Sequence, residues 1–524
     1  MKKLKIVLAA VLCTVMAVCF VACTPGGSDY EINYDIDLNN KPQLNVLMPY
    51  SGKPISEVNA DPTAKLIEQL TGYTVNYTQL PAADASTTLN TELMDKRPYN
   101  VMKLTKDQFS DLVKDDMLVD ITDALSVFAP DMLENISEES WDAVTVDGRI
   151  YGVPERASSD NIENPIVFNQ DLLLQCNLDV PETLDEFTEV LRVLTQKLGR
   201  PALTFDQYTP LVYAVSAAFG IYSDWQEYTV NGKTEVLYYM NAPRYAEYVN
   251  YMHELYVAGY IDQEVATNDA AEASNRFVNG FTDSEVAKAA AYACSLWSVP
   301  AIVTGLQANG VITSTEAAGT LENQLAYLRA LKENKTDEEK VYRSSGYGYI
   351  IAIPFYEAEN AGYALDWMNS KIKDTAEESN FRSIVLGEEG VHWTYSPSQG
   401  YLPISDNFSE KDEASYFLTG TNENKYTEYW KARVRKQPEL YRAWSTLMDN
   451  ADAVGVYNVA DFTPPIEDYN SHRSAMEEYA QDQFYIMMKE GTSNINEYLT
   501  KLNSQQGGTV ATQAINQWYS TYNK

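Results

Sequence analysis

The sequence predicts an α/β protein that is divided into two large lobes, the second richer in helix than the first. Its 524 residues are too many for one ordinary hydrophobic core, and chains of this length usually divide into separate compact units. Hydrophobic residues make up 45% of the chain, which is enough to fill sizeable cores. Strand-like and helix-like segments alternate over residues 43–114, the order from which parallel sheets are built.

The first elements follow from the spacing of apolar residues. The predicted elements are a strand at 43–50, a helix at 61–70, a strand at 74–78, a strand at 100–104 and a helix around 109–114. Pro62 stands near the start of the first helix, where its missing N–H does no harm. This order of strands and helices predicts a first lobe with parallel strand pairing.

The later elements contain more helix. The predicted elements are a helix at 183–198, a helix at 242–259 that stops at Gly259, a buried strand at 346–354, a helix at 358–371, and a helical tail at 475–522 that Gly507 and Gly508 interrupt. The helix at 183–198 opens with Thr183 and Glu186 in the spacing of a capping box. The chain shows no internal repeat.

The first residues have the layout of a bacterial secretion signal. Lys2, Lys3 and Lys5 precede an almost unbroken apolar run over residues 6–22, which ends at Cys23. The run is too short, and wrongly flanked, for a membrane-spanning helix. No second apolar run in the chain approaches membrane-spanning length, so we expect a soluble body.

Cys23 is the cysteine that suits lipid attachment. A signal peptidase needs a small residue just before the cut, and Ala22 precedes Cys23, whereas bulky Leu and Val precede Cys13 and Cys19. Residues 20–23 are similar to the bacterial lipobox, with Phe in the place of the usual Leu. We expect residues 1–22 to be a lipoprotein signal peptide and residues 23–40 to be the lipid anchor and a flexible tether. The alternative is a cleaved secreted protein with an incidental cysteine.

The charge of the chain limits its partners. The formal net charge is −35, and removal of residues 1–22 would make it −38. Such a surface repels phosphate backbones, which argues against nucleic acid, and it disfavours a strongly anionic solute. Beside the anchor only Cys176 and Cys294 remain, either as a disulfide outside the cell or as two separate buried thiols.

Six segments in one order resemble a known family. They are residues 146–154, 166–173, 181–187, 255–264, 277–280 with 289–297, and 386–395. Together they resemble the extracellular solute-binding proteins of ATP-dependent (ABC) importers, in the maltose-binding-protein-like family 1 and its long lipoprotein subgroup. The resemblance implies a type II periplasmic-binding-protein-like fold, with a hinge and an interlobe cleft.

The resemblance also implies an organisation and a role. It places lobe one at residues 41–153 plus 345–385 and lobe two at 154–344 plus 400–524. It implies a monomer on the outer face of the bacterial cytoplasmic membrane that captures a small solute, most simply an oligosaccharide, and delivers it to the permease subunits of an ABC transporter. We expect no cofactor, no metal and no enzymatic activity.

Six residues are expected to contact the ligand. Tyr50 and Ser51 end the first strand, where open α/β sheets place their binding crevice. Arg156 can donate paired hydrogen bonds to hydroxyls or a carboxylate, although a surface ion pair would look the same.

The other three are aromatic residues. The resemblance implies that Trp297 stacks on the ligand, and Trp393 and Tyr395 lie in a glycine-rich loop. Their rings suit the C–H face of a sugar, but a buried core Trp would look identical.

The chain carries no recognised catalytic or metal motif. His253, His392 and His472 are scattered, and no nucleophile elbow or phosphate-binding glycine loop is present. Three alternatives stay open: a surface-anchored glycan-active hydrolase or lyase, a sensor or adhesin that binds a protein, and a peptide- or aminosugar-binding member of the same fold.

Overall fold

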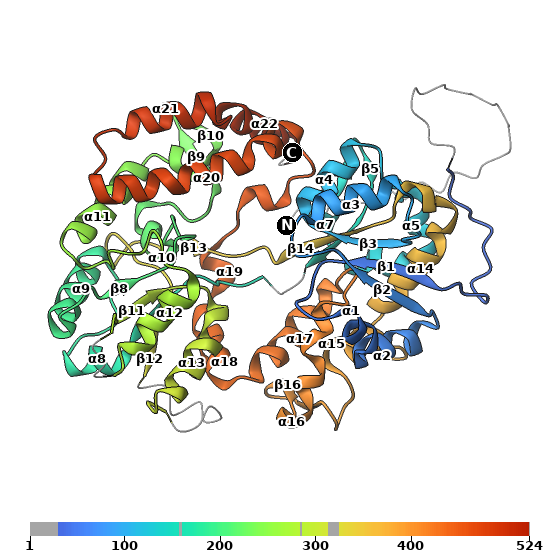
Figure 1. The fold of residues 1–524 in the computed structure, drawn as a ribbon, viewed down its shortest axis with the longest axis horizontal. Helices are drawn as coiled ribbons and strands as arrows, with labels where there is room; N and C mark the ends of the chain where they lie inside the picture. Colours follow the sequence, from blue (N-terminus) through green and yellow to red (C-terminus); the bar gives the residue numbers. More distant parts are fainter. Residues whose placement is uncertain (1–29, 157–159, 283–285, 313–323, 523–524) are drawn as a thin grey trace.

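The computed structural model describes residues 30–156, 160–282, 286–312 and 324–522, and these form two lobes that each contain their own sheet (Figure 1). The expected signal peptide, residues 1–22, and Cys23 lie outside the described residues. Residues 30–40, expected to belong to a flexible tether, lie against the first lobe. There Tyr30 packs edge-on against Phe355 with ring centroids 5.4 Å apart, because its apolar ring gains contact by docking.

The first lobe contains a five-stranded sheet in the order β2-β1-β3-β14-β6. The strands are β1 (Leu44–Met48), β2 (Val75–Gln79), β3 (Val101–Leu104), β6 (Val153–Arg156) and β14 (Tyr347–Ala352). The predicted parallel pairing of β1 with β2 and β3 is confirmed. β14 runs antiparallel to both β3 and β6, so its amino-terminal end lies beside the carboxyl ends of the other strands.

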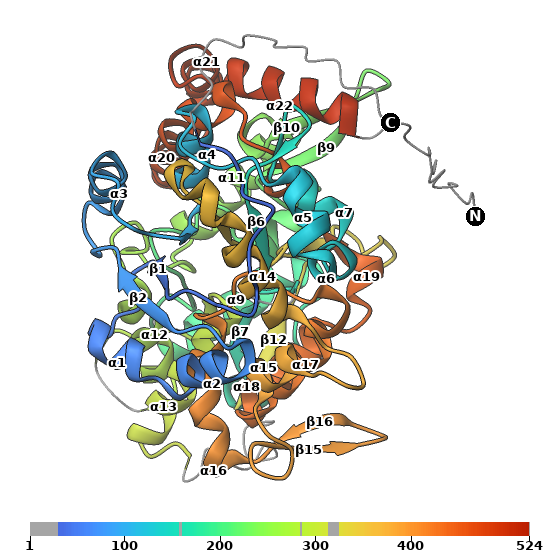
Figure 2. The same cartoon turned by 90° about the vertical axis from the view of Figure 1, so that its right-hand side faces the viewer.

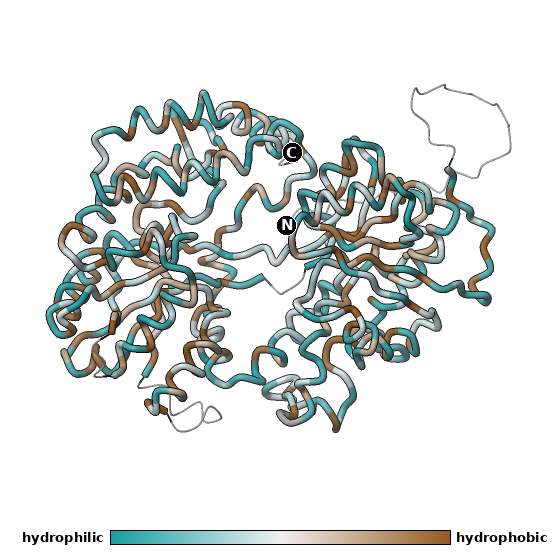
Figure 3. The backbone as a smooth tube through the Cα atoms, viewed as in Figure 1, coloured by the Kyte–Doolittle hydropathy of each residue, from teal (hydrophilic) through white to brown (hydrophobic). Residues whose placement is uncertain are grey.

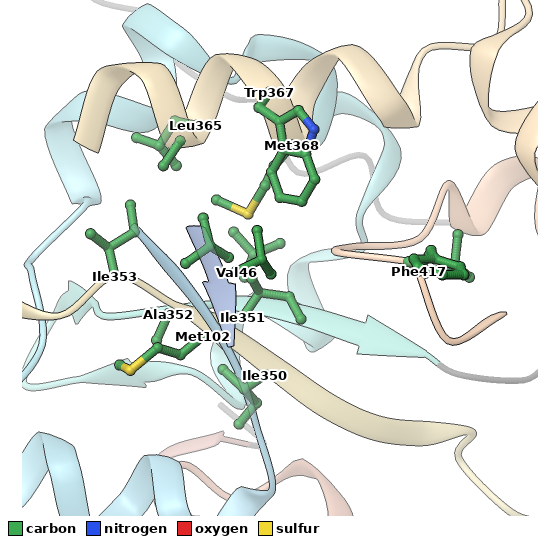
Figure 4. Packing of buried hydrophobic residues seen from close by; sticks show 14 of the residues in the cluster. Val46, Met102, Ile350, Ile351, Ala352, Ile353, Leu365, Trp367, Met368 and Phe417 are labelled. Carbon is green, nitrogen blue, oxygen red and sulfur yellow. The ribbon is translucent and has the colours of Figure 1, made fainter. Parts of the chain in front are cut away.

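Helices cover this sheet. They are α1 (Ile55–Ala60), α2 (Pro62–Thr71), α3 (Ala85–Met94), α4 (Lys106–Lys114), α5 (Thr122–Phe128), α6 (Pro130–Asn135), α7 (Glu138–Asp142), α14 (Ala361–Ile372), α15 (Asn380–Leu386) and α16 (Ser405–Phe408). Figure 4 shows Leu365, Trp367 and Met368 of α14 lying over Val46 and Ile351 of the sheet, all of them buried. The hairpins β4 (Thr145–Val146) with β5 (Arg149–Ile150) and β15 (Trp393–Ser396) with β16 (Gly400–Pro403) complete the lobe.

The second lobe contains a four-stranded sheet in the order β12-β7-β11-β8. The strands are β7 (Ile166–Asn169), β8 (Leu203–Thr204), β11 (Ala291–Ala293) and β12 (Leu325–Leu328). β8 and β11 are parallel, and β7 runs antiparallel to β11 and β12. A separate hairpin, β9 (Trp225–Val230) with β10 (Lys233–Tyr238), and the short pair β13 (Val341–Tyr342) and β17 (Gly455–Val456) lie beside this sheet.

The second lobe is rich in helix, as the sequence predicts. Its helices are α8 (Gln170–Gln175), α9 (Leu184–Leu198), α10 (Tyr213–Ser216), α11 (Tyr245–Val257), α12 (Ala270–Asn279), α13 (Val299–Ala308), α18 (Pro438–Leu447), α19 (Ala451–Val454), α20 (Glu467–Glu490), α21 (Ile495–Gln505) and α22 (Gly508–Tyr522). The Thr183 hydroxyl caps α9 by accepting from the Glu186 N–H at 3.4 Å, but the Glu186 carboxylate accepts from the Glu182 N–H rather than closing the predicted capping box. Figure 2 shows α20, α21 and α22 gathered at one end of the molecule.

The boundary between the lobes differs from the one expected near residue 400. The core of the first lobe includes Phe408, Phe417 and Tyr429, so the chain after residue 400 belongs first to lobe one. The helix α17 (Glu423–Arg435) then carries the chain across, since Val434 packs in a core cluster of the second lobe.

Apolar stretches gather along the strands of both lobes in Figure 3.

A buried ion pair explains why this segment returns to the first lobe. Lys103 on β3 is 2% exposed, and its Nζ lies 2.8 Å from Glu155 Oε1 on β6. The same ammonium group donates to the carbonyl oxygens of Tyr416 and Leu418 at 2.9 and 3.0 Å. Buried Lys371 donates to the Phe417 carbonyl oxygen at 2.6 Å. Burial raises the pKa of Glu155 and lowers the pKa of Lys103, and the ion pair opposes both shifts.

Two further expectations concern cysteines and membrane spans. Cys176 and Cys294 are both free thiols, and Cys294 is buried, which agrees with the second of the two alternatives. Within the described residues, no helix combines the length and apolar character needed to cross a membrane.

We predict that Glu155→Gln destabilises the first lobe strongly. The change leaves Lys103 and Lys371 buried without a carboxylate, and breaking a buried pair on one side costs roughly 3–5 kcal/mol. Chemical denaturation with the free energy of unfolding as readout checks this. Glu189→Gln, which breaks an exposed pair with Arg192, is the matched control and should leave the unfolding midpoint unchanged. Equal stability of the two variants would contradict the prediction.

Candidate functional site

The strand ends of the first lobe form one side of the candidate site. The carboxyl ends of β1, β2 and β3 and the amino end of antiparallel β14 lie at the same edge of the sheet. Open α/β sheets bind their ligands beyond this edge. Tyr50 and Ser51 follow β1 at this edge, as predicted, and the Tyr50 side chain is 52% exposed.

A hydrogen-bond network holds this edge in place. The Gln79 amide group, at the end of β2, hydrogen-bonds to the Ser51 hydroxyl at 2.7 Å and to the Tyr416 hydroxyl at 3.0 Å. The Tyr416 hydroxyl lies 2.8 Å from the Pro49 carbonyl oxygen, to which it donates. Lys53 adds an ion pair with Glu413 at 2.7 Å. The segment that Lys103 fixes therefore also positions Ser51.

The strand ends of the second lobe border a cavity of about 350 Å³. It lies where β8 and β11 end and where β7 begins, which is the equivalent edge of the second sheet. We call it the acidic cavity, and the lining residues that matter below are Asp206, Tyr208, Tyr213, Asp224, Tyr238, Tyr239 and Glu477. The sequence analysis did not identify them, because they come from four separate segments without a shared motif.

The carboxylates of this cavity influence one another. Burial, together with the nearby Glu477 and Asp461, raises the pKa of Asp224 to about 7. Burial also raises the pKa of Glu477. The Tyr213 hydroxyl donates to Asp224 Oδ1 at 3.3 Å, which supports the ionised form. The cavity therefore combines acceptor groups with tyrosine side chains, of which Tyr208 is 71% exposed.

A second, smaller cavity of about 220 Å³ lies at the hinge. It is lined by Lys106 and Tyr349 of the first lobe and by Tyr342 and Asp461 on the side of the second lobe. The Tyr342 ring stacks on Tyr213 of the acidic cavity, with centroids 4.5 Å apart. One aromatic pair thus joins the two cavities.

Polar contacts hold the lobes together beside these cavities. Lys106 Nζ at the start of α4 donates to the Ala460 carbonyl oxygen at 2.8 Å. Further along α4, Asp107 pairs with Arg473 of α20 at 2.5 Å, and the exposed Lys114 pairs with Glu467 at 2.7 Å. Exposed ion pairs of this kind contribute little to stability.

Trp297 lies at the junction between the lobes. It follows Ser295 of the acidic cavity, is 36% exposed, and meets Trp430 of α17 edge-on at 5.5 Å. Trp430 packs against the cores of both lobes. The sequence analysis missed Trp430, because a helical Trp carries no signal that distinguishes a junction from a core.

Arg156 is held within the structure. Its guanidinium group lies 3.9 Å from Glu423, and it stacks over the Tyr347 ring at 5.2 Å. Glu423 also accepts a hydrogen bond from the Ser140 hydroxyl at 2.6 Å. This corresponds to the ion-pair alternative rather than to a free donor for a ligand.

Trp393 and Tyr395 do not join the other candidates. Trp393 is 5% exposed and packs in the core of the first lobe, where its indole N–H donates to the Gly387 carbonyl oxygen at 3.0 Å. Tyr395 is exposed on the β15–β16 hairpin, which projects from the lobe in Figure 2. Trp393 therefore offers little ring surface, although it lines one side of a cavity of about 510 Å³ in the first lobe, and its contact with a ligand stays a prediction.

We predict that the two tryptophans differ in their effect on stability. Trp393→Ala should lower the free energy of unfolding by roughly 3–5 kcal/mol, the usual loss for a buried aromatic. Trp297→Ala should cost clearly less, because Trp297 is partly exposed already. Denaturant unfolding of both variants beside the wild type checks this, and equal losses would place Trp297 in the core.

Comparisons with known proteins agree with this architecture. Residues 57–310 match the family model described as bacterial extracellular solute-binding protein. An uncharacterised protein of Niallia circulans is 27% identical over 53% of this chain and 100% of its own length. The polygalacturonan/rhamnogalacturonan-binding protein YtcQ of Bacillus subtilis is 23% identical over 64% of each chain.

A solved structure supports the fold over nearly the whole chain. The HMO-binding, ABC-transporter-associated solute-binding protein of Bifidobacterium longum infantis superposes with a TM-score of 0.64 at 16% identity, covering 92% of this chain and 99% of that one. Its likeness concerns the two-lobed type II fold. Residues 57–310, close to half of the chain, thus match the family of bacterial extracellular solute-binding proteins.

Proposed function

We propose that this protein captures an oligosaccharide between its two lobes and delivers it, chemically unchanged, to the permease of an ABC importer. The observation that carries the proposal is the acidic cavity, which places several tyrosine rings beside carboxylates at the strand ends of the second lobe. Tyrosine rings cover the apolar face of a sugar, and carboxylates accept hydrogen bonds from its hydroxyls. The sugar-binding names of YtcQ and the Bifidobacterium protein support the same cargo class.

The two lobes would contribute different groups. Trp297 and the residues of the acidic cavity would contact the sugar from the second lobe, and Tyr50 and Ser51 would contact it from the first lobe. Closure of the lobes would bury the sugar and create a shape that a permease can distinguish from the empty protein. The exposed Lys114–Glu467 pair is one contact that such a motion can break cheaply. Arg156 and Trp393 would support the lobes rather than bind the sugar.

We predict that Trp297→Ala weakens sugar binding. Loss of a partly exposed ring at the junction should cost roughly 1–3 kcal/mol of binding free energy, the range for truncated aromatic anchors. Titration calorimetry against a panel of neutral and charged oligosaccharides measures this. Tyr34→Ala, a change of an exposed aromatic on the first lobe, serves as the control and should bind as the wild type does. Absence of heat with every sugar would refute the proposed cargo.

We also propose that Cys23 carries a lipid that anchors the protein outside the cytoplasmic membrane. The small residue Ala22 just before Cys23, and the apolar run over residues 6–22 that ends there, support this. Expressed with its own leader in a Gram-positive host, the wild type should fractionate with membranes. Cys23→Ala should abolish lipid attachment, visible as a loss of mass and of metabolic fatty-acid labelling. A labelled Cys23→Ala protein would contradict the assignment.

A glycan-active hydrolase is the second candidate, and one observation favours it. Asp224 has a pKa of about 7 and lies in a cavity with Glu477, and paired carboxyl groups of this kind can act as acid and base on a glycosidic bond. Mass spectrometry of the sugars recovered after the titrations separates the two functions. Intact sugars agree with capture, and shortened sugars whose appearance depends on Asp224 agree with hydrolysis.

A further inference from the structure

The acidic cavity contains three carboxylates and, among the described residues that line it, no lysine, arginine or histidine. Asp206 follows β8, Asp224 precedes β9, and Glu477 comes from α20. Three separate segments thus direct negative charge toward one space of about 350 Å³.

The three carboxylates differ in the hydrogen bonds and ion pairs that the rest of the protein offers them. Asp206 Oδ1 accepts from the Thr209 hydroxyl at 2.9 Å. Glu477 lies 3.6 Å from Arg473, but Arg473 makes its shorter ion pair, of 2.5 Å, with Asp107 of the first lobe. Asp224 receives one long hydrogen bond from Tyr213, and the charged groups that influence its pKa are the acidic Glu477 and Asp461. Asp224 is therefore the carboxylate with the least compensation.

The size and lining of the cavity suit an organic cation better than a metal ion. Among the described residues, no group of three or more acidic, histidine or cysteine side chains is close enough together to hold a metal. Tyr208, which is 71% exposed, also lines the cavity, and the negative faces of aromatic rings attract cations. A protonated amine would fill such a space, relieve the repulsion between Asp224 and Glu477, and contact a ring.

We propose that the acidic cavity binds a protonated amine of the cargo, so that the preferred cargo is an oligosaccharide with free amino sugars. The inference rests on the proposed capture of a sugar and adds its chemical class. A uronic acid would bring a fourth negative charge into the cavity, so carboxylated sugars are excluded from this position. An N-acetylated sugar has lost the charge that Asp224 recognises.

Matched sugars test this proposal. Titration calorimetry at pH 7.0, where sugar amines still carry protons and about half of Asp224 is ionised, compares glucosamine and galactosamine oligosaccharides with their N-acetylated forms and with oligogalacturonate. The wild type should bind an amine form at least tenfold more tightly than its acetylated form and should not bind oligogalacturonate. Asp224→Asn should remove the amine preference, so that the amine form and the acetylated form of each sugar bind this variant with equal affinity. Asp482→Asn, an exposed change on α20 outside the cavity, should keep the preference.

The outcomes separate this inference from the proposed function. If acetylated sugars bind as tightly as amines, or if the amine preference survives Asp224→Asn, the inference is wrong although sugar capture stands. If no sugar binds, sugar capture fails. The cation site is then tested by the melting temperature of the protein, measured with ethanolamine and with ethylene glycol, which lacks the amine. If ethanolamine alone raises the melting temperature and Asp224→Asn abolishes this rise, the cavity binds cations. If ethanolamine does not raise it, the cavity is not a cation site.

Discussion

The ion pair between Lys103 and Glu155 is the interaction on which the arrangement of the first lobe depends. It joins β3 to β6 across β14, and the free hydrogens of Lys103 hold the returning segment at Tyr416 and Leu418. Tyr416 in turn bonds the Pro49 carbonyl oxygen and the amide of Gln79, and so sets the edge from which the first lobe faces the second. A buried pair of this kind tolerates no missing partner, so the position of the edge is strongly determined.

The part of the lobe junction where α4 meets α20 is built from weaker interactions. The contacts of α4 with α20 are ion pairs and hydrogen bonds, whereas each lobe is filled with its own apolar core. Apolar cores are close-packed and resist deformation, but exposed polar contacts exchange readily with water. This contrast suits rigid lobes that move relative to each other. Arg473 connects the junction to the acidic cavity, because it pairs with both Asp107 and Glu477.

The predictions that succeeded and failed differ in physical kind. Local patterns located β1, β2, β3, β14 and most of α9 and α14 within a few residues, because apolar periodicity reports which face of a segment is buried. Tyr50 and Ser51 follow the end of β1, as expected, and their contact with a ligand stays a prediction. Trp297 and Trp393 were both expected at the ligand, because a buried tryptophan and a partly exposed one look identical in a sequence. Only the fold shows that one indole is buried and the other partly exposed.

The sequence alone determined the fold class and the family, through alternating strands and helices and through ordered segments that resemble one family. These are local or linear properties, and a linear reading suffices for them. The tertiary structure decided that residues 408–432 belong largely to the first lobe, that Arg156 is bound in an ion pair, and that Asp206, Asp224 and Glu477 share one cavity. Those facts depend on contacts between residues up to hundreds of positions apart, and no periodicity or motif in the chain encodes such contacts.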